Sequence, residues 1–304
     1  MIRILLIFIL IWQPIYAAYH TMISDLGISA QSIALGNTHS FNSSSETIFS
    51  NPAALVFSHG HSFSIFSTNL NDGGVNYLQL SLSSNTDFGT IGAGVYHQKV
   101  ADIPKTAEYF NSIINQDKIY TVGYYGYKNS IYTLAYQTSL LQNVSVGLNF
   151  NYYNVSVDTY RGTGNNIDLG ILFPVKHSLI SIYTQNIIPN RSVNYSHNKS
   201  DLLPFIGSIS SYIPIYKVIF IPQITYQKSL ILMSSGLSYS PAFLPYIKLL
   251  GGYKEQLDYT SNKHRKFTFG FGFTFFALDI FYAYERSDYY LKDHHTYISL
   301  NYQL

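Results

Sequence analysis

The chain has 304 residues, a net charge of +2 and no cysteine, and only 11% of its residues are charged. Typical soluble domains are about 25% charged. A soluble protein of this composition would therefore have too few charged side chains to cover its surface. The lack of cysteine excludes disulfides, thiol catalysis and cysteine-ligated zinc. A charge of +2 without a basic cluster argues against a nucleic-acid partner. The mean hydropathy of +0.06 is too low for a helical membrane protein.

Residues 1–18 are typical of a secretory signal peptide. Arg3 supplies the positive charge, residues 4–12 form a short apolar run, and Ala17 and Ala18 resemble a cleavage site. The alternative is a membrane anchor, but the run has about half of the ~20 residues that a helical span needs. We therefore expect export of the protein and cleavage after Ala17 or Ala18.

Residues 19–58 do not alternate in the way that a barrel wall does. Residues 25–36 carry apolar side chains at loose helical spacing, and 41–46 is a loop rich in serine and asparagine. Asn51 and Pro52 follow, a pair that favours a turn. Taken alone, this pair predicts an ordinary turn before the first strand.

Residues 59–304 alternate with a period of two. The clearest example is a row of five phenylalanines with Thr or Gly between them: Phe267, Phe269, Phe271, Phe273 and Phe275. Successive side chains of a strand point to opposite faces, so one face here is apolar and the other small and polar. A soluble sandwich also alternates, but five phenylalanines on one face indicate contact with lipid. The pattern predicts an all-β fold, a transmembrane antiparallel β-barrel.

Fourteen segments have this pattern, and most have about the 9–11 residues of a tilted spanning strand. They are 61–69, 75–83, 88–98, 130–140, 144–157, 165–173, 178–186, 203–213, 217–228, 230–240, 244–256, 265–275, 277–286 and 294–304. An even number places both ends of the chain on the periplasmic side. Residues 118–127 could be a fifteenth strand. We expect them instead in a long external loop, 99–129, as a small hairpin above the membrane.

The lengths of the connections support this orientation, because such barrels have short periplasmic turns and longer external loops. The expected short turns are 141–143, 174–177, 214–216, 241–242 and 276–277, and the expected long loops are 99–129, 158–164, 187–202, 257–264 and 287–293. The very short connection at Ser229 is an exception. Tyrosines such as Tyr152, Tyr153 and Tyr239 lie near predicted strand ends, as in the aromatic girdles of membrane barrels.

The segment before the first strand resembles a known family. Ser32, Leu35 and Gly36 are followed about fifteen residues later by a second group: Asn51, Pro52, Ala53, Ala54 and Leu55. This spacing resembles the N-terminal signature of the PorV/PorQ family and of the wider FadL-like outer-membrane barrels. Further similarity lies at 102–106, 165–173 and 278–304. The family usually has two acidic residues before the motif, whereas only Glu46 is present here.

The resemblance implies a barrel of about 14 strands in the outer membrane of a Gram-negative cell, with residues 19–58 plugging the lumen. PorV-type barrels hold exported proteins for type IX secretion, and loops 99–129 and 187–202 would then bind the cargo. The alternative is a FadL-like transporter for long-chain fatty acids or other hydrophobic compounds. Transport would need an apolar lumen, to which Leu172 and Phe281 would contribute, and a lateral opening, for which Gly251 and Gly252 could kink a strand.

Residues that could carry chemistry are few. His59 with His61, and His294 with His295, could bind a metal, but no carboxylate accompanies either pair, so we expect no metal. The predicted lumen-facing polar residues are Asp168, Asp279 and Glu285, together with Lys248. Such charges usually pair with each other or with a plug. No nucleophile, histidine and acid are arranged for hydrolysis, so we expect neither an enzyme nor a cofactor.

Overall fold

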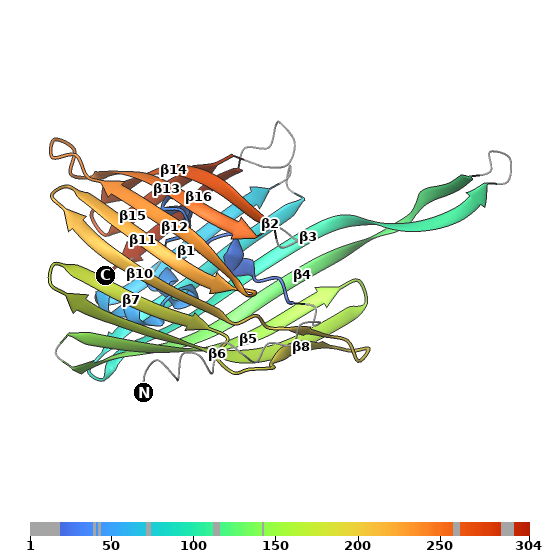
Figure 1. Ribbon diagram of the computed structural model, residues 1–304, viewed down its shortest axis with the longest axis horizontal. Helices are drawn as coiled ribbons and strands as arrows, with labels where there is room; N and C mark the ends of the chain where they lie inside the picture. The colour runs from blue at the N-terminus through green and yellow to red at the C-terminus, as the bar shows by residue number, and fades with distance from the viewer. Residues whose placement is uncertain are drawn as a thin grey trace.

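The computed structural model describes residues 19–38, 41, 44–70, 74–111, 116–141, 143–257, 262–286 and 295–304. The predicted signal peptide lies outside these residues. Figure 1 shows a tilted, closed barrel with one long hairpin projecting from it. Each barrel strand pairs antiparallel with its neighbour in sequence, and β1 closes the barrel by pairing with β16.

Fourteen strands form the closed wall, as predicted. They are β1 (His61–Leu70), β2 (Val75–Thr86), β3 (Gly89–Asn111), β4 (Gln116–Leu141), β5 (Val144–Val157), β6 (Tyr160–Val175), β7 (Ser178–Gln185), β10 (Ile206–Ile215), β11 (Val218–Gln227), β12 (Leu230–Tyr239), β13 (Ile247–Leu257), β14 (Lys263–Phe275), β15 (Leu278–Glu285) and β16 (His295–Gln303). The short β8 (Ser192–Tyr195) and β9 (Ser200–Leu202) form a hairpin beside β6. The predicted fold class is therefore confirmed.

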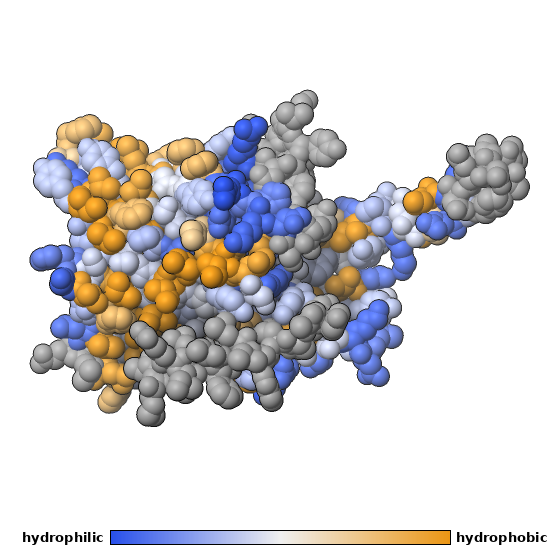
Figure 2. All heavy atoms as spheres, in the orientation of Figure 1, coloured by the Kyte–Doolittle hydropathy of each residue, from blue (hydrophilic) through white to orange (hydrophobic). Residues whose placement is uncertain are grey.

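The two faces of the wall follow the predicted alternation. The five phenylalanines of β14 point outward and are 40–66% exposed, whereas Thr268 between them is fully buried. Tyr152 is exposed on the outer face, but Tyr153 is buried inside the barrel, so only the first belongs to an outer girdle. Figure 2 shows apolar side chains over much of the visible wall. The outer surface is thus suited to contact with hydrocarbon.

The two ends of the barrel differ in their connections, although less regularly than predicted. We call the end with 87–88, 176–177 and 276–277 the short-turn end, and the opposite end the long-loop end. The expected long loop 158–164 is wrong, because β5 and β6 extend to a two-residue turn in which Asp158 has φ 53°. The expected short turn at 241–242 is a seven-residue connection, 240–246.

Strands β3 and β4 continue far beyond their neighbours. β2 pairs with β3 only as far as Val100, and β5 pairs with β4 only from Tyr127. Beyond these points, 101–111 and 116–126 pair with each other in the described ladders, and we call this segment the β3–β4 arm. About 11 residues at ~3.3 Å each span roughly 35 Å (Figure 1). Residues 118–127 are therefore not a fifteenth strand but part of β4, and the hairpin expected within 99–129 is present as an extension of β3 and β4.

The segment before β1 fills the barrel, as the resemblance implied. It contains η1 (Ile23–Asp25), α2 (Ala30–Ala34), η2 (Ser45–Phe49) and η3 (Pro52–Phe57), and we call it the plug. Its first residues lie toward the long-loop end, where the backbone N–H of His20 donates to the carbonyl of Leu202 at 2.9 Å. Within the described part of the chain, no helix is long and apolar enough to cross a bilayer.

Candidate functional site

The asparagine–proline motif of the plug is hydrogen-bonded to the wall and packs closely against it. The Nδ2 of Asn51 donates to Ser181 Oγ at 2.7 Å, and its Oδ1 accepts the N–H of Ala53 at 2.9 Å, which caps η3. A Cβ on Gly170 would lie 1.8 Å from Asn51 Oδ1, and one on Gly147 would lie 2.4 Å from the Ala53 nitrogen. The motif is therefore more than an ordinary turn, because two glycines of the wall are needed to accept it.

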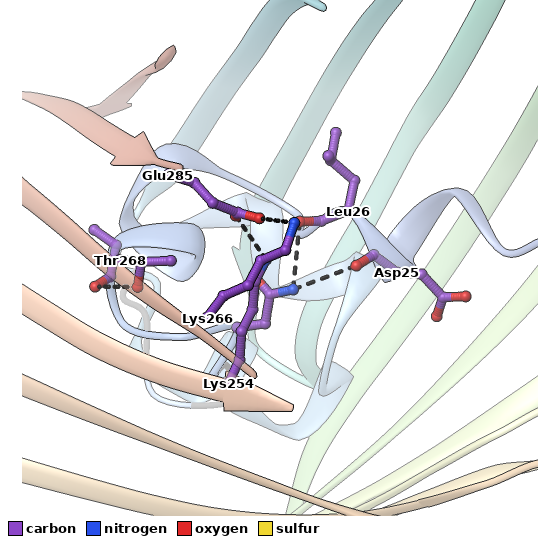
Figure 3. Close-up of polar contacts among 8 residues, drawn as sticks. Asp25, Leu26, Lys254, Lys266, Thr268 and Glu285 are labelled. Carbon is purple, nitrogen blue, oxygen red and sulfur yellow. Dashed lines mark hydrogen bonds and ion pairs between the residues drawn. The ribbon is translucent and has the colours of Figure 1, made fainter. Parts of the chain in front are cut away.

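The Leu35 and Gly36 motif meets a second group of wall glycines. A Cβ on Gly236 would lie 2.8 Å from the carbonyl oxygen of Leu35, and one on Gly252 would lie 2.1 Å from the Gly36 nitrogen. Gly36 has φ +69°, a conformation that suits glycine at the end of a helix. Thr268 Oγ1 donates to the carbonyl of Ala34 at 3.1 Å (Figure 3). Both motifs of the plug are thus held by close contact between the plug backbone and glycines of the wall.

The single acidic residue of the motif region, Glu46, joins the two parts of the plug. It is completely buried, and its Oε1 accepts Ser29 Oγ at 2.9 Å. Ser29 also caps α2 by accepting the N–H of Ser32 at 3.2 Å. Next to Glu46, Ser45 Oγ donates to Ser64 Oγ of β1 at 2.9 Å. A buried carboxylate with hydrogen bonds of this kind holds the plug in one position.

The three acidic residues predicted to face the lumen do so, but they lie apart. Asp168 is buried and accepts Asn151 Nδ2 at 2.7 Å, Tyr183 Oη at 3.1 Å and the N–H of Asn186 at 2.9 Å. Its hydrogen bonds stabilise β5, β6 and β7 behind the plug. Asp279 lies near the short-turn end of β15, and Glu285 ends the same strand at the long-loop end.

A cavity of about 340 Å³ lies between the plug and the wall toward the long-loop end. We call it the upper cavity. Its apolar lining includes Met22, Ile23, Leu26, Phe49, Leu232 and Tyr297. Its polar lining includes Asp25, Gln227, Lys228, Lys254, Lys266 and Glu285. Gln227 Nε2 donates to Asp25 Oδ1 at 3.1 Å, which fixes η1 against β11. The volume and mixed lining suit a small amphiphilic or hydrophobic molecule.

One side of the upper cavity carries a buried charge cluster. Lys254 Nζ lies 2.7 Å from Glu285 Oε2, and Lys266 Nζ lies 3.0 Å from Glu285 Oε1. All three side chains are buried and point toward one another (Figure 3). Two ammonium groups and one carboxylate leave this cluster with one net positive charge, whereas Lys228, Asp25 and Glu255 elsewhere in the lining bring the cavity as a whole to equal numbers of lysines and carboxylates. An anionic group in the cavity would meet this charge in surroundings that screen it less than bulk water does.

The wall is split beside the cluster. The described ladder between β12 and β13 ends at Ser234 and Lys254. Beyond that point, Glu255 Oε2 accepts the N–H of Met233 at 3.2 Å, and Glu255 Oε1 lies 3.4 Å from Arg265 Nε. Glu255 is on the outward-facing side of β13, yet it lines the cavity together with the inward-facing Lys254. The cavity therefore reaches between the two strands, at what we call the seam.

The seam is the break in the wall that corresponds to the expected lateral opening, but it does not lie at the glycines where a kink was expected. β13 keeps a regular register with β12 and β14 through Gly251 and Gly252, so the expected kink at these glycines is wrong. Gly252 instead accepts the plug, and Gly251 faces outward. On β12 the side chains that face outward beside the seam are apolar, and Ile231 and Met233 are exposed there.

The N-terminal end of the plug carries a buried histidine. The ring of His20 packs edge-on against Tyr153 with centroids 5.9 Å apart, and its Nε2 lies 3.2 Å from Asn129 Nδ2. Burial lowers the pKa of His20 to about 4. The charge of Asp201 and the hydrogen bond with Asn129 raise this pKa and so oppose part of the effect of burial. The imidazole is therefore neutral near pH 7.

Metal ligands are not grouped anywhere among the described residues: none of their histidine and acidic side chains form a set of three or more that could hold an ion. His61 begins β1 at the short-turn end, and its N–H donates to the carbonyl of Leu304. His295 lines the upper cavity, and His294 lies outside the described residues. Lys248 Nζ lies 5.8 Å from the ring centroid of the lumen-facing Phe281.

No protein-family model matches the chain, and no curated protein matches it either. Several solved structures do. The toluene transporter TodX of Pseudomonas putida has a TM-score of 0.60 and 12% identity over 94% of this chain and 98% of its own. The toluene transporter TbuX of Ralstonia pickettii has a TM-score of 0.63 and 10% identity over 93% and 100%. A FadL homologue of Pseudomonas aeruginosa has a TM-score of 0.56 and 9% identity over 95% and 100%.

Identities this low show a shared fold. The chain has the 14-stranded architecture of FadL-like outer-membrane barrels. This agrees with the wider of the two resemblances drawn from the sequence, and it leaves the PorV/PorQ assignment without support.

Proposed function

We propose that the protein is an outer-membrane channel for hydrophobic compounds, long-chain fatty acids among them. The observation that carries this proposal is the upper cavity, which lies between the plug and the wall and continues into the seam between β12 and β13. The solved structures of similar fold include two toluene transporters and a FadL homologue, which supports this choice. The protein would reach the outer membrane through cleavage of residues 1–18, and it would act without a cofactor or catalytic group.

The plug argues for a route through the side of the barrel. Ile28, Ile33, Ile48 and Leu55 are fully buried, and the glycine contacts at Gly170 and Gly252 leave no space for a ligand beside the backbone. A molecule in the upper cavity would have to displace the plug to continue along the axis. Passage through the seam only requires β12 and β13 to separate further above Lys254, where side chains replace the ladder.

The lining also indicates what the ligand carries. Its apolar side chains favour a hydrocarbon body, and the net positive charge of Lys254, Lys266 and Glu285 favours an anionic end. A fatty acid has both parts. An uncharged aromatic hydrocarbon would use only the apolar part, so uptake of the two compounds should depend differently on the charge cluster.

A disulfide across the seam tests the route, because the chain has no cysteine of its own. Continuing the register from Ser234 and Lys254 places Ile231 opposite Leu257. With Ile231→Cys and Leu257→Cys, oxidation should reduce oleate and toluene uptake, in cells without other such channels, to the level of cells lacking this protein. A reductant should restore uptake. The control pair is Leu237→Cys with Gly251→Cys, which links two residues already paired in the ladder. Wild-type uptake by the oxidised seam variant would rule out the side route.

A second candidate is the PorV-type carrier of exported proteins, with type IX secretion components as partners. One observation favours it: the β3–β4 arm carries exposed Tyr109, Ile119, Val122 and Tyr124 far from the barrel. An isolated two-stranded hairpin is only marginally stable in water, so a bound protein would stabilise it. Replacing 101–126 by a two-residue turn should abolish cargo capture and leave hydrocarbon uptake unchanged. Loss of uptake with intact capture would contradict both assignments.

A further inference from the structure

A second cavity, of about 300 Å³, lies in the outer face of the wall. We call it the outer notch. It is lined by Tyr152, Thr163, Gly164, Asn165, Asn190, Arg191, Ser192 and Asn194. It does not belong to the upper cavity, with which it shares no lining residue.

The notch results from a change of partner along one edge of β6. Toward the short-turn end, β7 pairs with β6 from Val175 to Leu169. Toward the long-loop end, β8 pairs with β6 at Gly162 and Thr163. The chain between β7 and β8 passes along the inner side of β6, where Asn166 Nδ2 donates to the carbonyl of Ile188 at 3.1 Å. A Cβ on Gly164 would lie 2.7 Å from the carbonyl oxygen of Ser192, so the glycine allows this segment to approach and form one wall of the notch.

The position of the notch relative to the apolar belt is given by the strand register. Tyr132, Tyr152 and Asn165 are opposite one another on β4, β5 and β6. Both tyrosines are exposed on the outer face, and the next outward row toward the short-turn end contains the exposed Leu134 and Phe150. Exposed tyrosines between apolar and polar rows mark the membrane–water interface. The notch therefore opens where lipid headgroups lie.

The lining of the notch is rich in hydrogen-bond donors. Arg191 supplies a guanidinium group, Asn165, Asn190 and Asn194 supply amides, and none of the described lining residues is acidic. Ser192 Oγ donates to Asn194 Oδ1 at 2.9 Å, so the nitrogen of that amide is the group able to donate into the notch. Guanidinium and amide donors together bind phosphate oxygens well.

We propose that the outer notch binds the phosphate-bearing headgroup of an outer-leaflet lipid, with Arg191 as its principal contact. The lipid tail would lie over Tyr152 and Phe150 on the apolar belt. The proposal does not depend on what passes through the barrel, because the notch opens to the side of the wall and not to the lumen.

Native mass spectrometry of the folded protein tests this, with phosphatidylglycerol and lipid A as probes and diacylglycerol, which has no phosphate, for comparison. Arg191→Ala should weaken retention of both anionic probes about tenfold, the factor that corresponds to one charged hydrogen bond. Arg161→Ala is the matched control, since Arg161 is an exposed outward-facing arginine of β6 outside the notch. Equal retention by the two variants, or equal retention of the three lipids by the wild type, would overturn the proposal.

Two further measurements keep the test decisive. Asn165→Asp places a negative charge in the notch and should also weaken retention of phosphatidylglycerol, which covers the case in which Arg191→Ala does not fold. Millimolar inorganic phosphate should displace little of the bound lipid, because it lacks the tail that holds the lipid on the belt. Complete displacement would identify a site for soluble phosphate and defeat the lipid assignment.

Discussion

Two halves of the lumen, the one around the plug and the one around the upper cavity, are built from the same strands with opposite kinds of side chain. On β13 the inward-facing residue changes from Gly252 to Lys254 over one step of the alternation, and on β14 it changes from Gly270 through Thr268 to Lys266. Glycine lets the plug backbone touch the wall, whereas lysine keeps the wall at a distance and supplies charge. The boundary between a sealed barrel and a binding cavity is therefore set by two or three residues per strand.

The largest expected effect comes from removing the carboxylate of the charge cluster. Glu285→Gln leaves Lys254 and Lys266 buried without the carboxylate that lies within 3.0 Å of both. Breaking a buried ion pair from one side costs about 3–5 kcal/mol, so we expect a loss of about 4 kcal/mol in the free energy of unfolding. Urea unfolding in detergent micelles measures it. A loss below that of Lys254→Met would mean that the cavity is hydrated enough to support two lysines.

A change in the plug half should cost somewhat less and act through shape. Gly170→Val places side-chain carbon against Asn51 Oδ1, and we expect about 3 kcal/mol of destabilisation, near the upper end for overpacking. Proteolysis should then also cut the plug faster. Gly251→Val is the matched control, since a Cβ there has no described atom within 4 Å. Equal stability of the two variants would contradict the tight seating of the motif.

Removing one lysine should be milder and selective for ligand charge. Lys254→Met keeps the length of the side chain and leaves Lys266 beside Glu285, so we expect a cost of about 1–2 kcal/mol, below that of leaving a buried charge alone. The cluster then has no net charge, and oleate uptake should fall more than toluene uptake. A parallel fall for both compounds would show that the charge does not select the ligand.

The smallest effect concerns pH and the beginning of the plug. His20 has a folded-state pKa of about 4, below its usual value of about 6.5. Between these values the unfolded segment binds more protons than the folded one, so stability is present near pH 7 and is lost as the pH falls toward 4. We expect roughly 1 kcal/mol of loss between pH 7 and about 5.7. Hydrogen exchange of residues 19–26 should rise over this range, and His20→Gln should remove the dependence.

The wall could be predicted from the sequence because alternation is a local property. The Phe row of β14 and the inward Asp168 needed only the period of two. The plug motif was found by its resemblance, and its physical role became visible only when Gly147 and Gly170 were placed beside Asn51. Those contacts join residues more than ninety positions apart, which no local pattern records.

The upper cavity and the seam could not be predicted in the same way. The parity of Lys254 and Lys266 was available from the sequence, but their meeting with Glu285 depends on the register of three strands. The split between β12 and β13 depends on where one ladder ends. The β3–β4 arm was expected only as a small hairpin separate from the wall, because spanning strands were expected to end near eleven residues.

The β3–β4 arm has one more consequence, given the outer-membrane location proposed above. It extends roughly 35 Å from the barrel along a ladder of its own. An antibody or a bacteriophage approaching the cell would meet this hairpin before the barrel mouth. Substitutions there would alter recognition by such agents while the lumen keeps its shape.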